Sequence, residues 1–268
     1  MLTLQETEQK YGSRIILRSL VGSTVHGTNV DDGQEDRDEM AIVIPRFEWI
    51  VTLGNPWEGD VYRSAVERTG NHNSKSYAGD LDLTLYSLLK WVRLALAGNP
   101  TVLIVLYSQP ITATAEGREL QQMRNLFASK EAGWRIQKYL ESQRKKMTGE
   151  RGGKGVRREE LVERYGYDTK FAMQALRLGL QGVELMTYGH LTLPMPAIRA
   201  NFLKDVRTGK YTMSEVLDIC RGLEADLEQA KNTAALPEKT DGRAVMDWVR
   251  DTYSEWWDMD RMERNDGW

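Results

Sequence analysis

The stretch VGSTVHGT at residues 21–28, followed by EDRD at residues 35–38 and AIVI at residues 41–44, decides the fold of this chain. Residues 14–21, which are mostly apolar and lead into the glycine turn, predict one strand, and the AIVI run predicts a second. LDLTLY at residues 81–86 alternates apolar and polar side chains, which predicts a third, half-buried strand. The strands are therefore expected in the first half of the chain.

Composition places the chain among ordinary globular proteins. Its 268 residues are 41% hydrophobic and 28% charged, which excludes wholesale disorder and allows one large domain or two small ones. The net charge is −3, so any attraction for nucleic acid must be local. The single cysteine, Cys220, excludes an intrachain disulfide and a multi-cysteine zinc site. With no signal peptide and no membrane-spanning run in the sequence, we expect a cytoplasmic protein without membrane contact.

Helical patterns dominate from about residue 115 onward. One earlier helix is expected after Ser87, ended by Gly98-Asn99-Pro100, while the apolar run 102–107 fits either a strand or a helix. Another helix is expected after Asp168 or Thr169, either of which can cap it. Further helical patterns are found at residues 116–143, 214–231 and 241–257.

Two segments stand apart by charge. Residues 144–158 hold seven basic residues, one acid and four glycines, which predicts a mobile connection. It is either a solvated linker or a clamp on a triphosphate or a nucleic-acid acceptor, where each neutralised phosphate would add salt sensitivity. Residues 247–268 hold seven acids, three basic residues and four of the eight tryptophans, and docking on the body of the protein is favoured over docking on a partner.

The glycine turn and the acids after it carry the chemistry. Gly22 has no Cβ, so its backbone can approach a ligand, and Ser23 and the amides after it can donate to phosphate oxygens. Asp36 and Asp38 are two residues apart, so in an extended chain they share one side at roughly 6.6–6.8 Å along the chain. Two such carboxylates repel each other and need a cation, for which Mg²⁺ is suited.

Asp82 adds a third carboxylate, between Leu81 and Leu83 of the third predicted strand. Asp80 lies two positions earlier and shares its face, so either could be the third acid. Three convergent acids can hold two cations roughly 3.5–4 Å apart, the arrangement used in phosphoryl transfer. Each motif alone has a plainer interpretation, because Gly-Ser turns are common and acid-rich loops are mostly solvated. The ordered combination favours the phosphoryl-transfer interpretation.

This combination resembles the signature of the DNA polymerase beta-like nucleotidyltransferase superfamily. Residues 82–101, residues 165–177 and the GVELM at residues 182–186 resemble its RNA-repair-pathway, RNA-ligase-associated branch. The resemblance covers about residues 15–220. It implies an α+β fold, in which a small mixed sheet flanked by helices is followed by a helical domain. We expect a nucleotidyltransferase domain at residues 1–143, the basic connection at 144–158, and a helical domain with the acidic tail at 159–268.

The resemblance also implies roles for these residues. Gly22 and Ser23 would hold the triphosphate, and Asp36 and Asp38 would bind Mg²⁺. Asp82 would help to hold a second Mg²⁺ and could accept the proton of the attacking hydroxyl. The reaction would attach a nucleoside monophosphate from an NTP to an acceptor, with pyrophosphate leaving.

Two basic residues and one histidine are weaker candidates for nucleotide binding. Lys170 lies near the start of its predicted helix and Arg177 two turns on, so both could reach a phosphate. Basic residues on a helix are more often its solvated face. His26 lies inside the glycine turn, where a role in filling the turn is favoured over contact with phosphate or base.

Three functions fit this sequence. The first is an Mg²⁺-dependent nucleotidyltransferase that acts on an RNA or tRNA 3′ end, which the basic stretch and the resemblance support. The second keeps the chemistry but modifies a protein or a small molecule, which the net charge of −3 slightly favours. The third is a nucleotide-binding, antitoxin-like module that does not catalyse, which three costly carboxylates disfavour.

Overall fold

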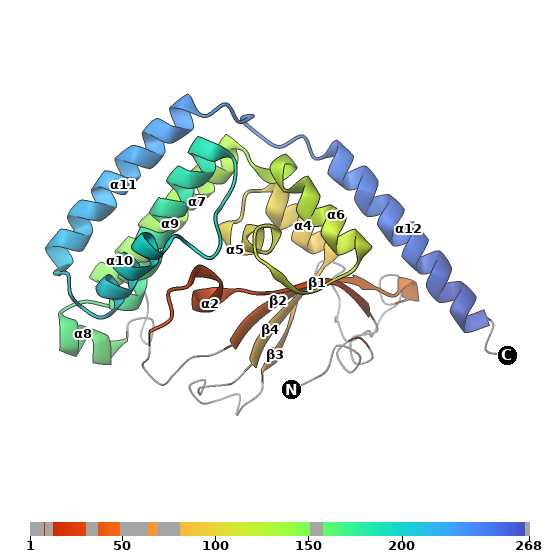
Figure 1. The fold of residues 1–268 in the computed structure, drawn as a ribbon, viewed down its shortest axis with the longest axis horizontal. Helices are drawn as coiled ribbons and strands as arrows, with labels where there is room; N and C mark the ends of the chain where they lie inside the picture. Colours follow the sequence, from red (N-terminus) through yellow and green to blue (C-terminus); the bar gives the residue numbers. More distant parts are fainter. Residues whose placement is uncertain are drawn as a thin grey trace.

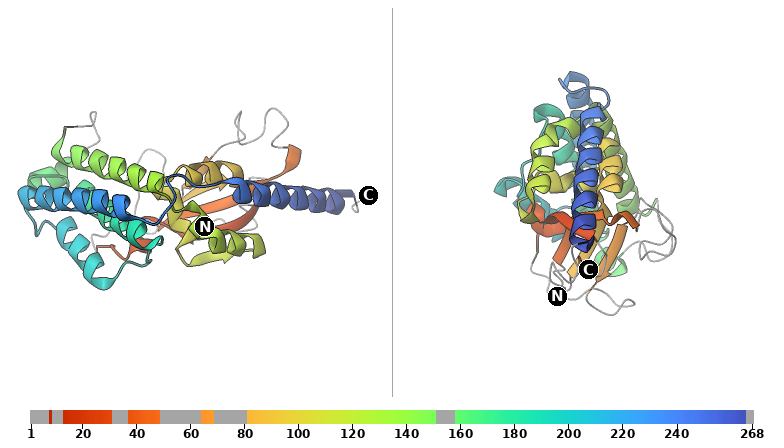
Figure 2. Two further views of the ribbon diagram at one scale, coloured as in Figure 1. Left: turned by 90° about the horizontal axis from the view of Figure 1, so that it is seen from above. Right: turned by 90° about the vertical axis from the view of Figure 1, so that its right-hand side faces the viewer.

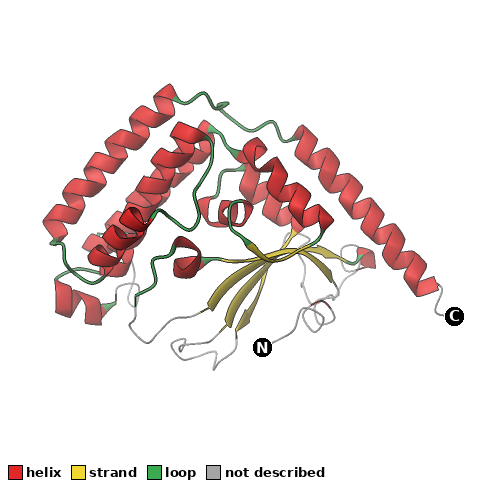
Figure 3. Cartoon of the chain, viewed as in Figure 1, coloured by secondary structure: helices red, strands yellow, loops and turns green. Residues whose placement is uncertain are grey.

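The computed structural model describes residue 8 and residues 13–30, 37–48, 64–68, 81–150 and 158–265. It has an α+β fold, as the sequence predicts, with one mixed sheet and helices gathered mainly on one of its faces (Figures 1 and 3). The strands are β1 (Ser13–Leu20), β2 (Arg37–Pro45), β3 (Ser64–Arg68), β4 (Leu81–Ser87) and β5 (Pro110–Ala113). The helices are α2 (Gly22–His26), α4 (Leu88–Leu96), α5 (Pro100–Leu103), η1 (Ile104–Leu106), α6 (Ala115–Gln122), η2 (Met123–Phe127), α7 (Lys130–Thr148), α8 (Glu159–Tyr165), α9 (Thr169–Tyr188), α10 (Ala197–Arg207), α11 (Met213–Thr233) and α12 (Arg243–Asn265).

The sheet runs in the order β3-β4-β2-β1-β5. β2 and β4 are parallel, whereas β1 pairs antiparallel with β2 and β5, and β3 pairs antiparallel with β4. The parallel register places Asp38 directly opposite Asp82. Because side chains alternate along a strand, these two aspartates lie on the same face of the sheet.

The pleat of β2 separates two apolar clusters. Met40 and Ile42 contribute to the main core, which α4, η1 and α7 complete. Ala41 and Val43 face the other way, into a smaller cluster with Leu83. All of these side chains are at most 3% exposed, which explains why the AIVI run is apolar without a break.

The apolar run 102–107, for which the sequence left strand and helix open, is helical and forms the end of α5 and η1. Gly98 follows the end of α4 and has a φ of +71°. The Asn99 side chain accepts a hydrogen bond from Thr101 N at 2.9 Å, and Pro100 lies in the first turn of α5. Gly98-Asn99-Pro100 therefore ends one helix and begins the next.

The later helices agree with the sequence, with two differences. Residues 116–143 are helical but divided, because Ser129 caps a new helix by accepting a hydrogen bond from Ala132 N. α7 continues to Thr148, so the first five residues of the predicted connection are helical, while residues 151–157 lie outside the described residues. Asp168 caps α9, and α11 and α12 cover the two remaining predicted helices.

The elements fall into two groups in space, with α7, α9 and α11 packed against one another at one end of the molecule (Figures 1 and 2). α7 therefore packs with helices that follow residue 158, although the sequence assigns it to the first domain. The domain boundaries at residues 143 and 159 stay a prediction.

α12 returns to the sheet, which confirms that the Trp-rich tail docks on the body of the protein. Trp257 Nε1 donates a hydrogen bond to the Pro45 carbonyl at 2.9 Å, and its ring contacts Phe47 and Tyr253 at centroid distances of 5.2 and 5.0 Å. The Tyr253 hydroxyl accepts a hydrogen bond from Leu89 N at 3.3 Å. Figure 1 shows α12 running past α6 toward the C-terminus.

Within the described residues, no single helix has the length and apolarity needed to cross a membrane. α4 and the α5–η1 segment meet that test only as a pair, and they are bent by 114° at the break between them. Their apolar side chains contribute to the main core.

We expect Trp257→Ala to lower the free energy of unfolding by about 2–4 kcal/mol, because it removes a half-buried ring and its hydrogen bond. Met259→Ala on the same helix is the control, since Met259 is 48% exposed and its loss should change stability by less than about 0.5 kcal/mol. Urea denaturation measures both. Equal effects of the two substitutions would contradict the docking of α12.

Candidate functional site

A cleft of about 410 Å³ lies between the sheet and the helices. β2 and β4 supply one wall, together with the first residue of α2. α5, η1, α7 and α9 supply the facing wall. Its volume is that of a site for one small ligand. Gly22, Asp38, Asp82 and Arg177, four residues singled out from the sequence, line it together.

Gly22 and Asp38 are packed directly against each other. Gly22 has a φ of +65°, and a Cβ placed on it would lie 2.0 Å from Asp38 Oδ2. The neighbouring Val21 N donates a hydrogen bond to the Asp38 carbonyl at 2.9 Å. Position 22 therefore requires glycine for two reasons, since its backbone is left-handed and the carboxylate occupies the space of a side chain. The glycine turn and the acid-bearing strand form one unit.

Asp38 and Asp82 make this part of the cleft acidic. They are opposite each other on neighbouring parallel strands, which lie about 4.8 Å apart. Glu39, the next residue of β2, is 1% exposed and forms ion pairs with Arg18 and Arg37 through its two oxygens. The carboxylate of Glu39 is thus neutralised by two arginines.

The donor set suits a hard divalent cation. Asp38 and Asp82 bring two carboxylates to one face of the sheet, and Mg²⁺ is usually held by one or two carboxylates together with substrate phosphates. Asp36 and the alternative third acid, Asp80, both lie outside the described residues. Among the described residues there is no group of three or more His, Cys, Asp or Glu side chains that could hold a metal ion.

Ser23 is the second residue of α2, and its carbonyl accepts hydrogen bonds from Thr28 N and Thr28 Oγ1 at 3.0 and 3.3 Å. These bonds close the turn after α2. They fix the backbone around Ser23, but they do not test its predicted contact with a triphosphate.

His26 joins α2 to α9. Arg177 Nη1 lies 2.7 Å from His26 Nε2, and it also donates to Gln181 Oε1 at 3.0 Å. Because a guanidinium can only donate, Nε2 is the acceptor in the contact with Arg177, while Nδ1 lies 3.3 Å from Gln181 Nε2. The His26 carbonyl accepts a further bond from Met195 N at 3.3 Å. His26 holds Arg177 at the cleft, which His26 itself also lines.

Burial shapes the charges of this pair. Desolvation, and secondly the nearby Arg177 charge, lower the pKa of His26 well below its usual 6.5. Burial lowers the pKa of Arg177 to about 10, so the guanidinium is still charged at neutral pH. The cleft thus carries a fixed positive charge that faces the two aspartates.

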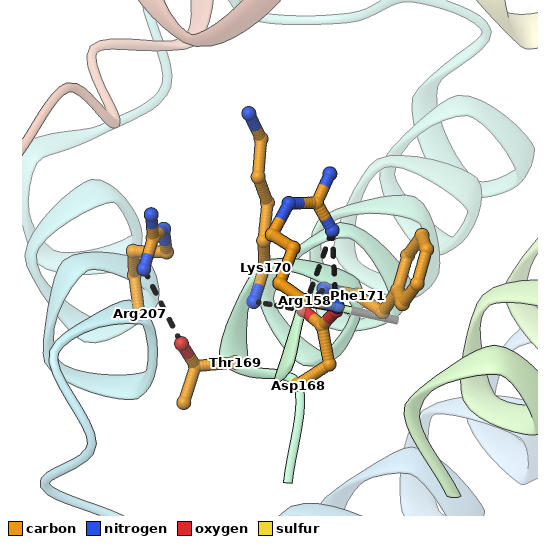
Figure 4. A network of polar contacts seen from close by, with 6 residues as sticks. All are labelled: Arg158, Asp168, Thr169, Lys170, Phe171 and Arg207. Atoms are coloured by element: carbon orange, nitrogen blue, oxygen red, sulfur yellow. Dashed lines mark hydrogen bonds and ion pairs between the residues drawn. The ribbon is translucent and has the colours of Figure 1, made fainter. Parts of the chain in front are cut away.

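Lys170 lies in the first turn of α9, two turns before Arg177, and Arg177 is the one of the two that lines the cleft. Asp168 caps this turn by accepting hydrogen bonds from Lys170 N and Phe171 N at 3.0 and 3.2 Å, and it also pairs with Arg158. Figure 4 shows Lys170 between Arg158 and Arg207, the last of which donates to Thr169 Oγ1. A contact of Lys170 with nucleotide stays a prediction.

Sequence reasoning missed part of the helical wall. Tyr139 and Gln143 of α7 and Gln174 of α9 also line the cleft, as do Tyr86 and Thr101. Gln174 belongs to a polar stripe with Lys170 and Arg177 at spacings of four and three residues on a largely apolar helix, and that spacing is visible in the sequence. Tyr139 and Gln143 are also four residues apart, but nothing near them in the sequence indicates a site.

Comparison with known proteins identifies a family. The model of the RNA repair pathway DNA polymerase beta family matches residues 1–251. No curated protein matches the chain. A solved structure of a nucleotidyltransferase-like protein from Exiguobacterium sibiricum is similar over 85% of this chain and 72% of its own, with 12% sequence identity and a TM-score of 0.30.

We expect Gly22→Ala to disrupt the cleft, since a methyl group at this position would overlap the Asp38 carboxylate. Gly27→Ala is the matched control, because Gly27 has a similar φ of +70° but its Cβ would meet only Pro194 Cβ, at an ordinary 3.7 Å. Both variants should lose about 1–2 kcal/mol from backbone strain. Gly22→Ala should lose clearly more in urea denaturation, and equal losses would contradict the contact.

The buried His26 should make stability depend on pH. Below pH 6.5 the unfolded chain binds a proton at this residue that the folded chain does not, so the free energy of unfolding falls as the pH falls. Between pH 7.5 and 5.5 this contribution should lower stability by about 1.4 kcal/mol. His26→Gln should remove that part of the dependence, whereas His190→Gln, at an exposed position, should retain it. Urea denaturation at a series of pH values gives the comparison, and identical slopes for all three proteins would refute it.

Proposed function

The chain belongs to the RNA repair pathway DNA polymerase beta family, and on that premise we propose that it transfers a nucleoside monophosphate from an NTP to a hydroxyl acceptor, an RNA or tRNA 3′ end, and releases pyrophosphate. The observation that carries this proposal is the cleft in which Gly22, Asp38, Asp82 and Arg177 meet. Carboxylates beside a glycine turn and a facing cation form a site for a phosphate chain and its counter-ions.

In this proposal Asp38 and Asp82 hold Mg²⁺, with Asp36 as the third ligand that the family resemblance implies. Bound Mg²⁺ would neutralise charge on the phosphates and on the attacking oxygen. Gly22 leaves room for the Asp38 carboxylate beside the glycine turn, and Ser23 donates to the phosphate oxygens. Arg177, fixed by His26, donates to a phosphate oxygen from the opposite wall, and Lys170 adds a second cation further along α9.

The transfer itself is a substitution at the α-phosphorus. The acceptor oxygen forms a bond to this phosphorus while the bond to the β-phosphate oxygen breaks, so pyrophosphate leaves. The proton of the acceptor hydroxyl passes to the Asp82 carboxylate. The residues of the cleft act mainly by positioning and by charge, which is where most catalysis of phosphoryl transfer arises.

The acceptor is the least constrained part of the proposal. Basic side chains at the end of α7 favour RNA, but Arg144 pairs with Glu224 and Arg158 pairs with Asp168, so part of this charge is already neutralised. A net charge of −3 keeps a protein or small-molecule acceptor as the second candidate. A cytoplasmic location also stays a proposal, supported by a single buried cysteine, whose pKa burial raises to about 12.

We expect Asp38→Asn and Asp82→Asn to reduce nucleotide transfer at least about 100-fold, because the cations they hold supply several kcal/mol of transition-state stabilisation. Asp218→Asn is the control, since Asp218 is exposed and pairs only with the neighbouring Arg221 among the described residues. The assay incubates each α-labelled NTP with Mg²⁺ and with RNA, protein and small-molecule acceptors. Label on RNA supports the proposal, and label on another acceptor moves it to the second candidate. Nucleotide binding without transfer would leave a non-catalytic module.

A further inference from the structure

The proposed function assigns no role to the α7 side of the cleft. Most groups suited to phosphates and cations, Gly22, Asp38 and Asp82, belong to the sheet and the glycine turn, and Arg177 faces them from α9. An NTP whose phosphates lie there must place its nucleoside elsewhere in the same cleft of about 410 Å³. The rest of the lining includes Tyr86 and Thr84 of β4, the start of α5, and Tyr139, Gln143 and Gln174 of the facing helices.

Gln143 differs from the other residues of this wall. Its Oε1 atom is shielded from solvent, and within the described part of the chain it has no hydrogen-bond partner. A buried acceptor without a donor is unfavourable, so such groups are normally satisfied. Gln143 lines the cleft, which makes a ligand in the cleft the natural source of that donor.

The local packing holds Gln143 in this position. The buried residues Ile136, Leu140 and Met147 fix α7 against the core, and Arg144 next to Gln143 pairs with Glu224 of α11 at 3.0 Å. Tyr139, one turn earlier, lies on the same face of α7 and also lines the cleft. The Oε1 atom is therefore presented by a rigid helix, as a specificity contact requires.

The two tyrosines define the surroundings of this contact. Burial, and secondly the nearby Tyr139, raise the pKa of Tyr86, so its hydroxyl is neutral at physiological pH. Lys90 Nζ lies over the Tyr86 ring, 5.8 Å from its centroid. Aromatic rings with polar tips beside an amide suit a nucleoside, which has an apolar ring face and polar edges.

We propose that Gln143 is a specificity-determining residue that accepts, at Oε1, a hydrogen bond from an N–H or O–H donor of the bound nucleoside. The donor is either on the edge of the base or a hydroxyl of the ribose. This inference rests on the proposed function, because it takes the ligand of the cleft to be an NTP. A site with a buried acceptor rejects analogues that lack the donor, because the acceptor is then left unpaired.

The test measures binding of non-hydrolysable NTP analogues to the full chain by calorimetry, with Mg²⁺ present. The four NTP analogues are compared first. The one that binds best is then compared with its counterpart that lacks hydrogen-bond donors on the base, and with its 2′-deoxy and 3′-deoxy counterparts. We expect one of these deletions to weaken binding to the wild-type chain at least about tenfold. The analogue whose binding is weakened shows whether the donor is on the base or on the ribose.

Gln143→Met retains the size of the side chain but removes the acceptor. It should bind the best NTP analogue about tenfold more weakly and lose the discrimination against the donor-deleted counterpart. Gln143→Glu retains an acceptor oxygen, so it should keep the ratio between the two ligands even if its charge weakens both. Gln229→Met, at an exposed position on α11, is the matched control and should behave as the wild type.

The outcomes separate this inference from the proposed function. If the wild-type chain binds NTP analogues and Gln143→Met keeps the full discrimination, the role of Gln143 is wrong while the nucleotide site stands. Equal binding of every donor-deleted ligand to the wild-type chain leads to the same conclusion. If no NTP analogue binds to the wild-type chain, the proposed function itself fails, and the inference fails with it.

Discussion

The contact between Gly22 and the Asp38 carboxylate is the constraint on which the site depends. Gly22 follows β1 and is the first residue of α2, whereas Asp38 lies on the central strand β2. With Asp38 Oδ2 in the place of a side chain on Gly22, neither residue can move without the other. The parallel register of β2 and β4 then fixes Asp82 opposite Asp38. A glycine and two aspartates from three separate segments are thereby positioned by backbone geometry alone.

The charges of the cleft explain why its two walls differ. The sheet contributes carboxylates, and α9 contributes Arg177, which contacts His26 and Gln181 among the described residues. These two described partners carry no negative charge, so they leave the positive charge of the guanidinium available to a phosphate in the cleft. The contact of His26 with Arg177 also couples the position of the guanidinium to that of the glycine turn. One connected set of contacts would therefore position both ends of a bound phosphate chain.

The sequence predicts the elements of the site better than their arrangement. Some features depend only on residues that are close in the sequence, so they can be recognised before the fold is known. They are the acids, the helix caps Ser87 and Asp168, and the strand patterns around residues 14–21, 40–44 and 81–86. The run 102–107 was ambiguous because apolar content alone does not distinguish a buried strand from a buried helix. Gln143 could not be found at all, since its distinction is an unpaired oxygen that exists only after α7 packs beside the sheet. Periodicity in the sequence carries no information of that kind.

Two adjacent acids of β2 have different environments, because successive side chains of a strand point to opposite faces of the sheet. Asp38 and Glu39 are adjacent in sequence, yet one lines the cleft beside Asp82, while the carboxylate of the other is neutralised by Arg18 and Arg37. Burying a carboxylate costs several kcal/mol unless it is paired, and on Glu39 two arginines meet that requirement. Asp38 and Asp82 lie opposite each other on the two parallel strands, and a cation bound between their carboxylates would reduce the repulsion of the two like charges. The same alternation that builds the apolar core on both faces of the sheet thus brings two carboxylates together at one place, next to the glycine that makes room for one of them.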